Sequence, residues 1–138
     1  MPTASESLAR IPLFANLSGR QLRKIAKRSS EHRYDAGTVM VREGGRTQTL
    51  FVIIEGTAKV IRNERTIARR SAGDVFGEIS MIDLRPRAAT VIAETPMVCV
   101  VLEHDDVRSL VMEDPPMAWS LLQSLAGRLR DTDEQIDP

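Results

Sequence analysis

A glutamate and an arginine in one short connection could act together on a phosphorylated sugar. They are Glu78 and Arg87 in FGEISMIDLRPRAAT (residues 76–90). Arginine presents a planar fork of N–H donors that suits two phosphate oxygens, and a carboxylate accepts a hydrogen bond from a sugar hydroxyl. Gly77 and the alanines after Arg87 keep the bulk beside both charges low, and a helical turn at FGEIS would add backbone N–H donors. The segment therefore offers groups for both halves of a ribose phosphate.

A simpler interpretation needs no ligand. Glu78 and Arg87 would then pair across a loop, and Gly77 and Pro86 would be ordinary turn residues. Exposed ion pairs of this kind are common in loops and contribute only about 0–1 kcal/mol. The residue types alone leave both interpretations open.

Composition restricts the classes of protein to consider. The 138 residues suffice for one domain, 42% of them are hydrophobic, and the formal net charge is zero, so no sustained basic field favours a nucleic-acid or membrane partner. Cys99 lies within the apolar run MVCVVL and is expected to be buried and inert. The start has no secretory signal pattern and no apolar run approaches the length of a membrane helix. We therefore expect a cytoplasmic location.

The middle of the chain has the pattern of a β domain. Between Tyr34 and Glu103, short β-branched runs alternate with turn signals, which predicts six or more strands in an antiparallel sandwich or jelly roll. LFVII (50–54) has no polar alternation, so both of its faces should be buried. The triplet RNE (62–64) could turn a hairpin.

Helical spacing frames this region on both sides. Residues 17–29 predict an amphipathic helix with Ser18 as its N-cap. Residues 105–112 predict a second helix, and a third begins at the prolines after Asp114. Its expected apolar stripe consists of Met117, Leu121, Leu122, Leu125 and Leu129.

Other polar clusters point to no reaction. His32 and His104 are far apart in sequence, so no metal site is expected, and no nucleophile–base arrangement suggests an enzyme. A basic face on the first helix is interpreted as solvated, with a partner surface, for instance for the acidic tail Asp131, Asp133 and Glu134, as the alternative. This face consists of Arg20, Arg23, Lys24, Lys27 and Arg28.

The segment 76–90 resembles the phosphate-binding cassette of cyclic-nucleotide-binding domains. That pattern runs Phe-Gly-Glu-(Leu/Ile)-(Ala/Ser), a few variable residues, then (Pro)-Arg-Ala-Ala-Thr. The likeness extends to residues 13–26, 35–45 and the strand–turn–strand around Gly56, and covers about residues 10–130. The resemblance implies a mainly β fold with flanking α-helices, an antiparallel jelly roll (double-stranded β-helix) preceded by one helix and followed by others. Residues 1–9 and 131–138 are expected to be polar, poorly ordered termini.

The resemblance also assigns roles by position. Glu78 would accept a hydrogen bond from the ribose 2′-hydroxyl, and Arg87 would bind the cyclic phosphate. Backbone amides near Ile79, Ser80 and Ala88 would complete the phosphate cradle. An alanine directly after the arginine, where cGMP-preferring members often have threonine, favours cAMP over cGMP. Leu84 departs from the small residue or glycine that is common in the family. The expected ligand-binding set is Phe76, Gly77, Glu78, Ile79, Ser80, Arg87, Ala88, Ala89 and Thr90.

The function implied is that of a sensor, not an enzyme, with no cofactor or metal. Occupancy by cAMP would move the last helices, and a homodimer through the C-terminal helix or an effector protein would read that movement. Trp119 would pack on the barrel or cap the base, and Arg128 or Arg130 could reach the base edge. Two alternatives stay open: a ligand-free jelly-roll interaction module, and a regulatory segment of a channel or enzyme.

The start of the chain looks most like bacterial regulators of the catabolite activator type, in which a DNA-binding module follows this domain. Only a few polar residues follow Leu129, so the sequence is interpreted either as a stand-alone sensor or as a part of a longer protein. Nucleic-acid binding by these residues alone is not expected.

Overall fold

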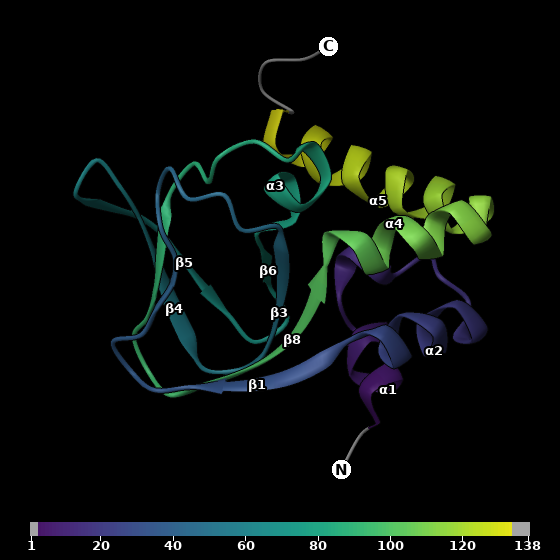
Figure 1. Cartoon of the computed structure of the whole chain (residues 1–138), viewed down its shortest axis with the longest axis horizontal. Coiled ribbons are helices and arrows are strands. Elements are labelled where there is room, and N and C mark those ends of the chain that lie inside the picture. Colours follow the sequence, from purple (N-terminus) through teal and green to yellow (C-terminus); the bar gives the residue numbers. More distant parts are fainter. Residues whose placement is uncertain (1–2, 134–138) are drawn as a thin grey trace.

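The helices gather at one end of two antiparallel sheets in the computed structural model, which describes residues 3–133 (Figure 1). The helical elements are α1 (Ala4–Ala9), the 3-10 turn η1 (Pro12–Phe14), α2 (Gly19–Arg28), α3 (Glu78–Asp83), α4 (His104–Glu113) and α5 (Pro115–Asp133). The strands are β1 (Ser30–Tyr34), β2 (Val39–Val41), β3 (Thr49–Glu55), β4 (Thr57–Arg62), β5 (Arg65–Ser71), β6 (Val75–Phe76), β7 (Thr90–Ala93) and β8 (Met97–Glu103).

The eight strands form two four-stranded sheets, ordered β1-β8-β3-β6 and β2-β7-β4-β5. Every paired strand is antiparallel. The helix α3 separates β6 of the first sheet from β7 of the second. The predicted mainly β jelly roll with flanking helices is confirmed, and the segment 76–90 connects its two sheets.

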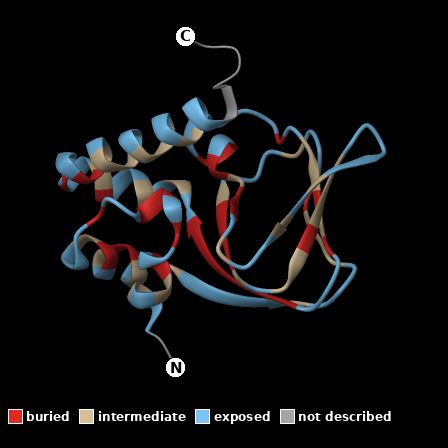
Figure 2. Cartoon of the chain, turned by 180° about the vertical axis from the view of Figure 1, so that it is seen from behind, coloured by how far each residue is buried: buried red, intermediate tan, exposed pale blue. Residues whose placement is uncertain are grey.

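The core has two parts, seen as red segments inside the fold in Figure 2. One cluster lies between the two sheets and includes Phe51, Ile53 and Phe76, with the rings of Phe51 and Phe76 stacked at 4.6 Å between centroids. The other lies between the first sheet and the helices and includes Leu50, Leu102 and Met117. The central strands β3 and β8 contribute to both clusters because both of their faces are covered.

Several local predictions are confirmed. Ser18 caps α2 in a capping box with Gln21. Of residues 50–54, which were expected to be buried, 50–53 are buried and Ile54 is half-buried. Cys99 is also buried, which raises the pKa of its thiol to about 12. The chain turns between β4 and β5 at residues 63–64, where Asn63 and Glu64 both have positive φ, as a tight hairpin turn requires.

Both ends of the described chain differ from the expected poorly ordered termini. The helix α1 lies within residues 1–9, and its Leu8 is fully buried. The burial of Leu8 in the core holds this helix in place. The sequence gave no helical signal here because the other side chains of the helix are small or polar. The helix α5 continues to Asp133. Asp131 and Asp133 of the expected acidic tail therefore belong to α5, whereas Glu134 lies outside the described residues.

The apolar stripe of α5 is narrower than the sequence suggested. Met117 is buried, and Leu121 and Leu125 are half-buried against the core. By contrast, Leu122 and Leu129 are 55% and 63% exposed. The packing expected for Trp119 is wrong, because that side chain is 63% exposed. The reason is helical geometry, since residues 119, 122 and 129 lie outside the stripe of Met117, Leu121 and Leu125 that packs on the core.

Candidate functional site

Arg87 is fixed in the wall of the barrel by its neighbours. Its side chain donates from Nε to Thr47 Oγ1 (3.1 Å), from Nη1 to the Gly77 carbonyl (3.0 Å) and from Nη2 to the Thr49 carbonyl (2.8 Å). The backbone of Arg87 exchanges two further hydrogen bonds with the Gly44–Gly45 loop. A guanidinium has five N–H groups, so one on each terminal nitrogen remains for a ligand.

Burial sets the electrostatics of this side chain. Arg87 is only 4% exposed. Burial lowers the pKa of its guanidinium, and the negative charges of Glu103 and Glu78 oppose that shift. Because a guanidinium is not deprotonated in proteins, the group keeps its charge. A buried cation with two remaining donors is a strong attachment point for an anion.

Gly77 makes this position of Arg87 possible. Its φ is +86°, a left-handed conformation that favours glycine. A Cβ there would lie 2.5 Å from the Thr49 carbonyl oxygen and 2.8 Å from Arg87 Nη1. Any other residue would therefore disturb the guanidinium itself and the Thr49 carbonyl that holds it.

Glu78 forms an ion pair with a residue of α5, and not with Arg87 as the simpler interpretation required. Its Oε1 accepts a hydrogen bond at 3.0 Å from Nη2 of Arg128, which comes from α5. The Glu78 side chain is 12% exposed and that of Arg128 is 40% exposed. Glu78 and Arg87 do not pair with each other, so each keeps acceptor or donor capacity toward the space between them.

That space is a cavity of about 180 Å³. Glu78 and Arg87 both line it, together with apolar side chains from the β2-β7-β4-β5 sheet such as Val41, Val60 and Val91. Arg70 of β5 also lines it. The cavity thus combines one apolar wall with one negatively charged and two positively charged side chains.

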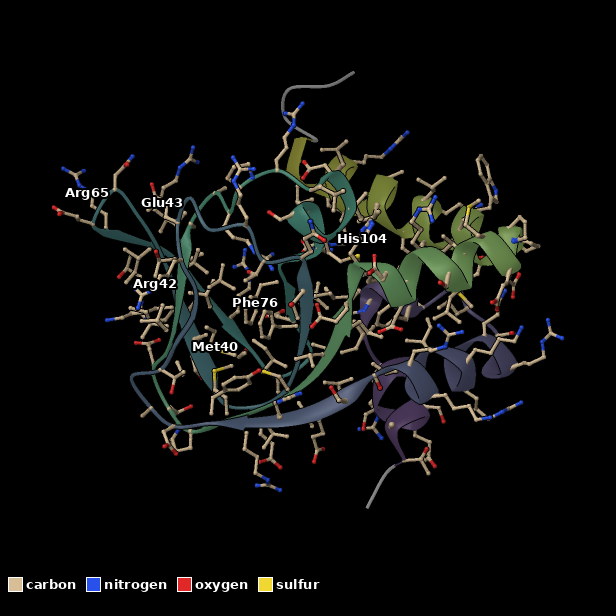
Figure 3. All side chains as sticks on the ribbon, in the orientation of Figure 1. Met40, Arg42, Glu43, Arg65, Phe76 and His104 are labelled. Atoms are coloured by element: carbon tan, nitrogen blue, oxygen red, sulfur yellow. The ribbon has the colours of Figure 1, made fainter. Side chains whose placement is uncertain are left out.

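Most of the expected ligand-binding residues lie in this cavity wall. Eight of the nine line it, namely Phe76, Gly77, Glu78, Ile79, Ser80, Arg87, Ala88 and Ala89. Phe76 points inward between the sheets, where Figure 3 labels it. Thr90 is not among the lining residues, and its hydroxyl accepts a hydrogen bond from the Glu43 amide at 2.9 Å. Ile79 projects outward and is 61% exposed, which leaves its backbone at the cavity.

The helix α3 is held at its far end as well. His104 Nδ1 lies 2.7 Å from the Met81 carbonyl oxygen, and because a carbonyl can only accept, Nδ1 donates (Figure 3). Leu84 ends the helix in a left-handed conformation with φ of 61°. The family's preference for a small residue or glycine here has a physical reason, since a side chain adds steric cost in that conformation.

Sequence reasoning missed the groups that support the two charges. Thr47 and Thr49, which hold Arg87, come from a distant segment that no local pattern marks. Arg70 was also missed, and it lines the cavity while its guanidinium donates to a backbone carbonyl. Arg128 was considered only for the base edge. A signal was present, because Arg128 lies eleven residues after Met117, about three helical turns on the same face. Arg130, the other candidate, is exposed.

Three further features bear on alternative functions. The basic face of α2 is mostly solvated, although Arg28 lies 3.6 Å from Asp106 of α4. No group of three metal-ligating side chains occurs within residues 3–133. Within the same residues, no helix combines the length and apolar character that crossing a membrane requires.

Comparisons with known proteins identify the family of the chain. The family model described as "Cyclic nucleotide-binding domain" matches residues 31–114. A cAMP-dependent protein kinase regulatory subunit of Mycosarcoma maydis is 34% identical over 124 residues, which is 86% of this chain and 22% of that protein. The Cyclic AMP receptor protein of Thermus thermophilus is 28% identical over 131 residues, which is 91% of this chain and 61% of that protein.

A solved structure gives the same result. The N-terminal domain of a transcriptional regulator from Streptomyces coelicolor superposes with a TM-score of 0.83 at 31% identity, covering 96% of this chain and 98% of that one. The chain belongs to the cyclic nucleotide-binding domain family, a family of regulatory domains. It spans between about a fifth and three fifths of the length of the two curated relatives.

Proposed function

We propose that this domain binds one cyclic nucleotide, cAMP in preference to cGMP, in the cavity between Glu78 and Arg87. The observation that carries the proposal is the buried Arg87 guanidinium, which three hydrogen bonds aim into the cavity wall. Its two remaining N–H groups match the two exocyclic oxygens of a cyclic phosphate.

The remaining contacts follow from the same wall. The first N–H groups of a helix have no acceptor within the helix. The amides of Ile79 and Ser80 at the start of α3 are therefore suited to donate hydrogen bonds to the phosphate oxygens. Gly77 and Ala88 allow the ligand to approach the backbone closely. The free lone pairs of the Glu78 carboxylate accept the ribose 2′-hydroxyl.

The preference for cAMP rests on Ala88. Family members that prefer cGMP often carry a threonine hydroxyl at this position, and Ala88 offers none. The names of the two curated relatives, both of which refer to cAMP, support the same preference.

Arg128 is the residue that we propose couples occupancy to α5. It neutralises Glu78, which would otherwise repel a phosphate in the same cavity, and it ties α5 to the binding site through the 3.0 Å contact. If the ligand binds more tightly when Arg128 contacts Glu78 than when α5 has moved away, binding favours the position of α5 in which this contact forms. The helix movement follows from this difference in affinity.

A second copy of the chain is the proposed partner of the outer face of α5. The residues Trp119, Leu122, Ala126 and Leu129 are all exposed, and their spacing of three, four and three residues is that of a coiled-coil seam. Leu122→Glu is expected to give monomers in analytical ultracentrifugation, whereas Gln123→Glu, one position away, leaves the dimer intact. Monomers in both the wild type and Gln123→Glu would contradict the proposed dimerisation through α5.

A ligand-free dimerisation module is the second candidate function, and the same exposed face of α5 favours it. Calorimetric titration of the chain with cAMP and cGMP separates the two functions. The proposal predicts saturable heat at one nucleotide per chain, with tighter binding of cAMP. An absence of heat at several temperatures, with no thermal stabilisation by either nucleotide, would leave the dimerisation module as the better account.

A further inference from the structure

A second cavity, of about 240 Å³, lies between the helices and the β1-β8-β3-β6 sheet. All of its lining side chains are apolar, and they include Phe14, Leu50, Leu102, Leu110, Met117 and Leu121. It shares no lining residue with the cavity of Glu78 and Arg87. The two cavities lie on different sides of α3, because Met81 and Ile82 line this one, whereas Glu78 and its neighbours line the other.

An apolar wall of this kind determines the class of occupant. A buried water needs two to four polar partners, so a cavity lined only by apolar side chains does not stabilise a water molecule. An empty space is also unfavourable, because the lining atoms lose their dispersion contacts. Apolar cavities of about 150 Å³ are known to stay dry and to bind benzene or xenon. A cavity of 240 Å³ is large enough for a benzene ring with a short alkyl group.

We infer that this cavity is a second binding site, for a compact apolar molecule such as a monocyclic alkylbenzene. Most of the lining side chains are buried, but Ile82 of α3 and Leu122 of α5 are 51% and 55% exposed. The cavity therefore reaches solvent where α3 and α5 meet, and the ligand enters there. Once bound, it contacts β3, β8 and α5 together.

Binding to this site stabilises the fold, because the cavity exists only when α5 is packed on the sheet. A ligand that binds only the folded state raises the free energy of unfolding by mass action. At ten times the dissociation constant, the thermal midpoint is expected to rise by about 5 °C for a domain of this size.

Methionine methyl groups report the occupant directly. The chain is labelled with ¹³C at its methionine methyls and titrated with ethylbenzene, and separately exposed to xenon under pressure. Met81 and Met117 line the cavity, so their resonances should shift saturably. Met40 and Met97 belong to the other core cluster and should not shift.

A cavity-filling variant and its matched control complete the test. Ala118 lines the cavity and Gln123 is exposed on the same helix, outside the proposed dimer seam. Ala118→Leu should abolish the shifts of Met81 and Met117, whereas Gln123→Leu should retain them. If Ala118→Leu does not fold, Leu121→Phe serves the same purpose. Unchanged Met81 and Met117 resonances in the wild type, or equal shifts in the filled variant, would overturn the inference.

The same experiment distinguishes this site from the nucleotide site. Arg87→Ala should lose nucleotide binding and keep the response to ethylbenzene, because Arg87 lines only the polar cavity. Loss of the ethylbenzene response in a folded Arg87→Ala chain would also count against a separate apolar site.

Discussion

Arg87 and Glu78 line the same cavity, but the barrel holds one and helix α5 holds the other. Five hydrogen bonds fix Arg87, three through its side chain and two through its backbone, and all of them come from the β domain. Glu78 instead has a single ion pair, to Arg128 of α5. The comparison indicates that the β domain alone positions Arg87, whereas the contact of Glu78 depends on the position of α5. Under the proposed function, Arg87 marks the phosphate end of the cavity and Glu78 marks the ribose end.

The largest expected effect comes from removing the fixed end. Truncation of a buried charged contact costs about 2–5 kcal/mol. Arg87→Ala should therefore weaken cAMP binding by roughly thirty-fold to several thousand-fold in calorimetry. Arg85→Ala is the matched control, because Arg85 is exposed two residues away. Equal affinities of both variants, with circular dichroism showing intact folds, would exclude Arg87 as the phosphate ligand.

The next effect tests whether Gly77 is needed for that fixed end. Gly77→Ala combines positive φ with a clash against Thr49 and Arg87, and should lower the free energy of unfolding by about 2–4 kcal/mol. Gly73 has a similar φ of +94° but open space around it, so Gly73→Ala should cost only about 1–2 kcal/mol. Urea denaturation measures both. A Gly77→Ala value no larger than that of Gly73→Ala would mean that the clash is relieved without disturbing Arg87.

A smaller effect is expected at the end that α5 controls. Arg128→Ala should weaken cAMP binding about three- to tenfold, because the ion pair is partly exposed and such pairs are weak. Arg130→Ala, on the exposed side of the same helix, should bind like the wild type. Tighter binding by Arg128→Ala would reverse the proposed coupling, since Arg128 would then compete with the ligand for Glu78.

The smallest effect concerns the end of α3. Leu84 has φ of 61°, so Leu84→Gly should raise the free energy of unfolding by up to about 1 kcal/mol. Leu84→Ala keeps a Cβ in the same conformation and should bring no such gain. Thermal unfolding compares the two variants, and a gain in Leu84→Ala alone would assign the effect to the 45% exposed leucine side chain rather than to the backbone.

The sequence predicted the contiguous parts of this site better than the distant ones. Residues 76–90 include both charges, the glycine and the low wall, so one segment was enough to place Glu78 and Arg87 in one cavity. The strands were predictable for a similar reason, because turn residues and β-branched runs alternate locally. Thr47 and Thr49 support Arg87 from about 40 residues away, and their role depends on strand pairing that no local pattern encodes.

The surface of α5 was the least predictable part. Apolar residues occur around most of this helix, so the sequence did not distinguish the side that packs on the sheet from the side that is exposed. Met117 and Leu121 face the core, whereas Trp119 and Leu122 face solvent. The length of α1 and its buried Leu8 were equally hidden, because a short helix with one buried residue leaves almost no periodic signal.

The most direct test of the central claim is a calorimetric cycle with cAMP and 2′-deoxy-cAMP, titrated into the wild type and Glu78→Gln. If Glu78 accepts the ribose hydroxyl, Glu78→Gln should weaken cAMP about tenfold, since a hydrogen bond to a charged group contributes about 1.5–3 kcal/mol. The same substitution should change 2′-deoxy-cAMP far less, because the cycle cancels the altered charge near the phosphate. Equal changes for both nucleotides, or no saturable binding of cAMP by the wild type, would contradict the account.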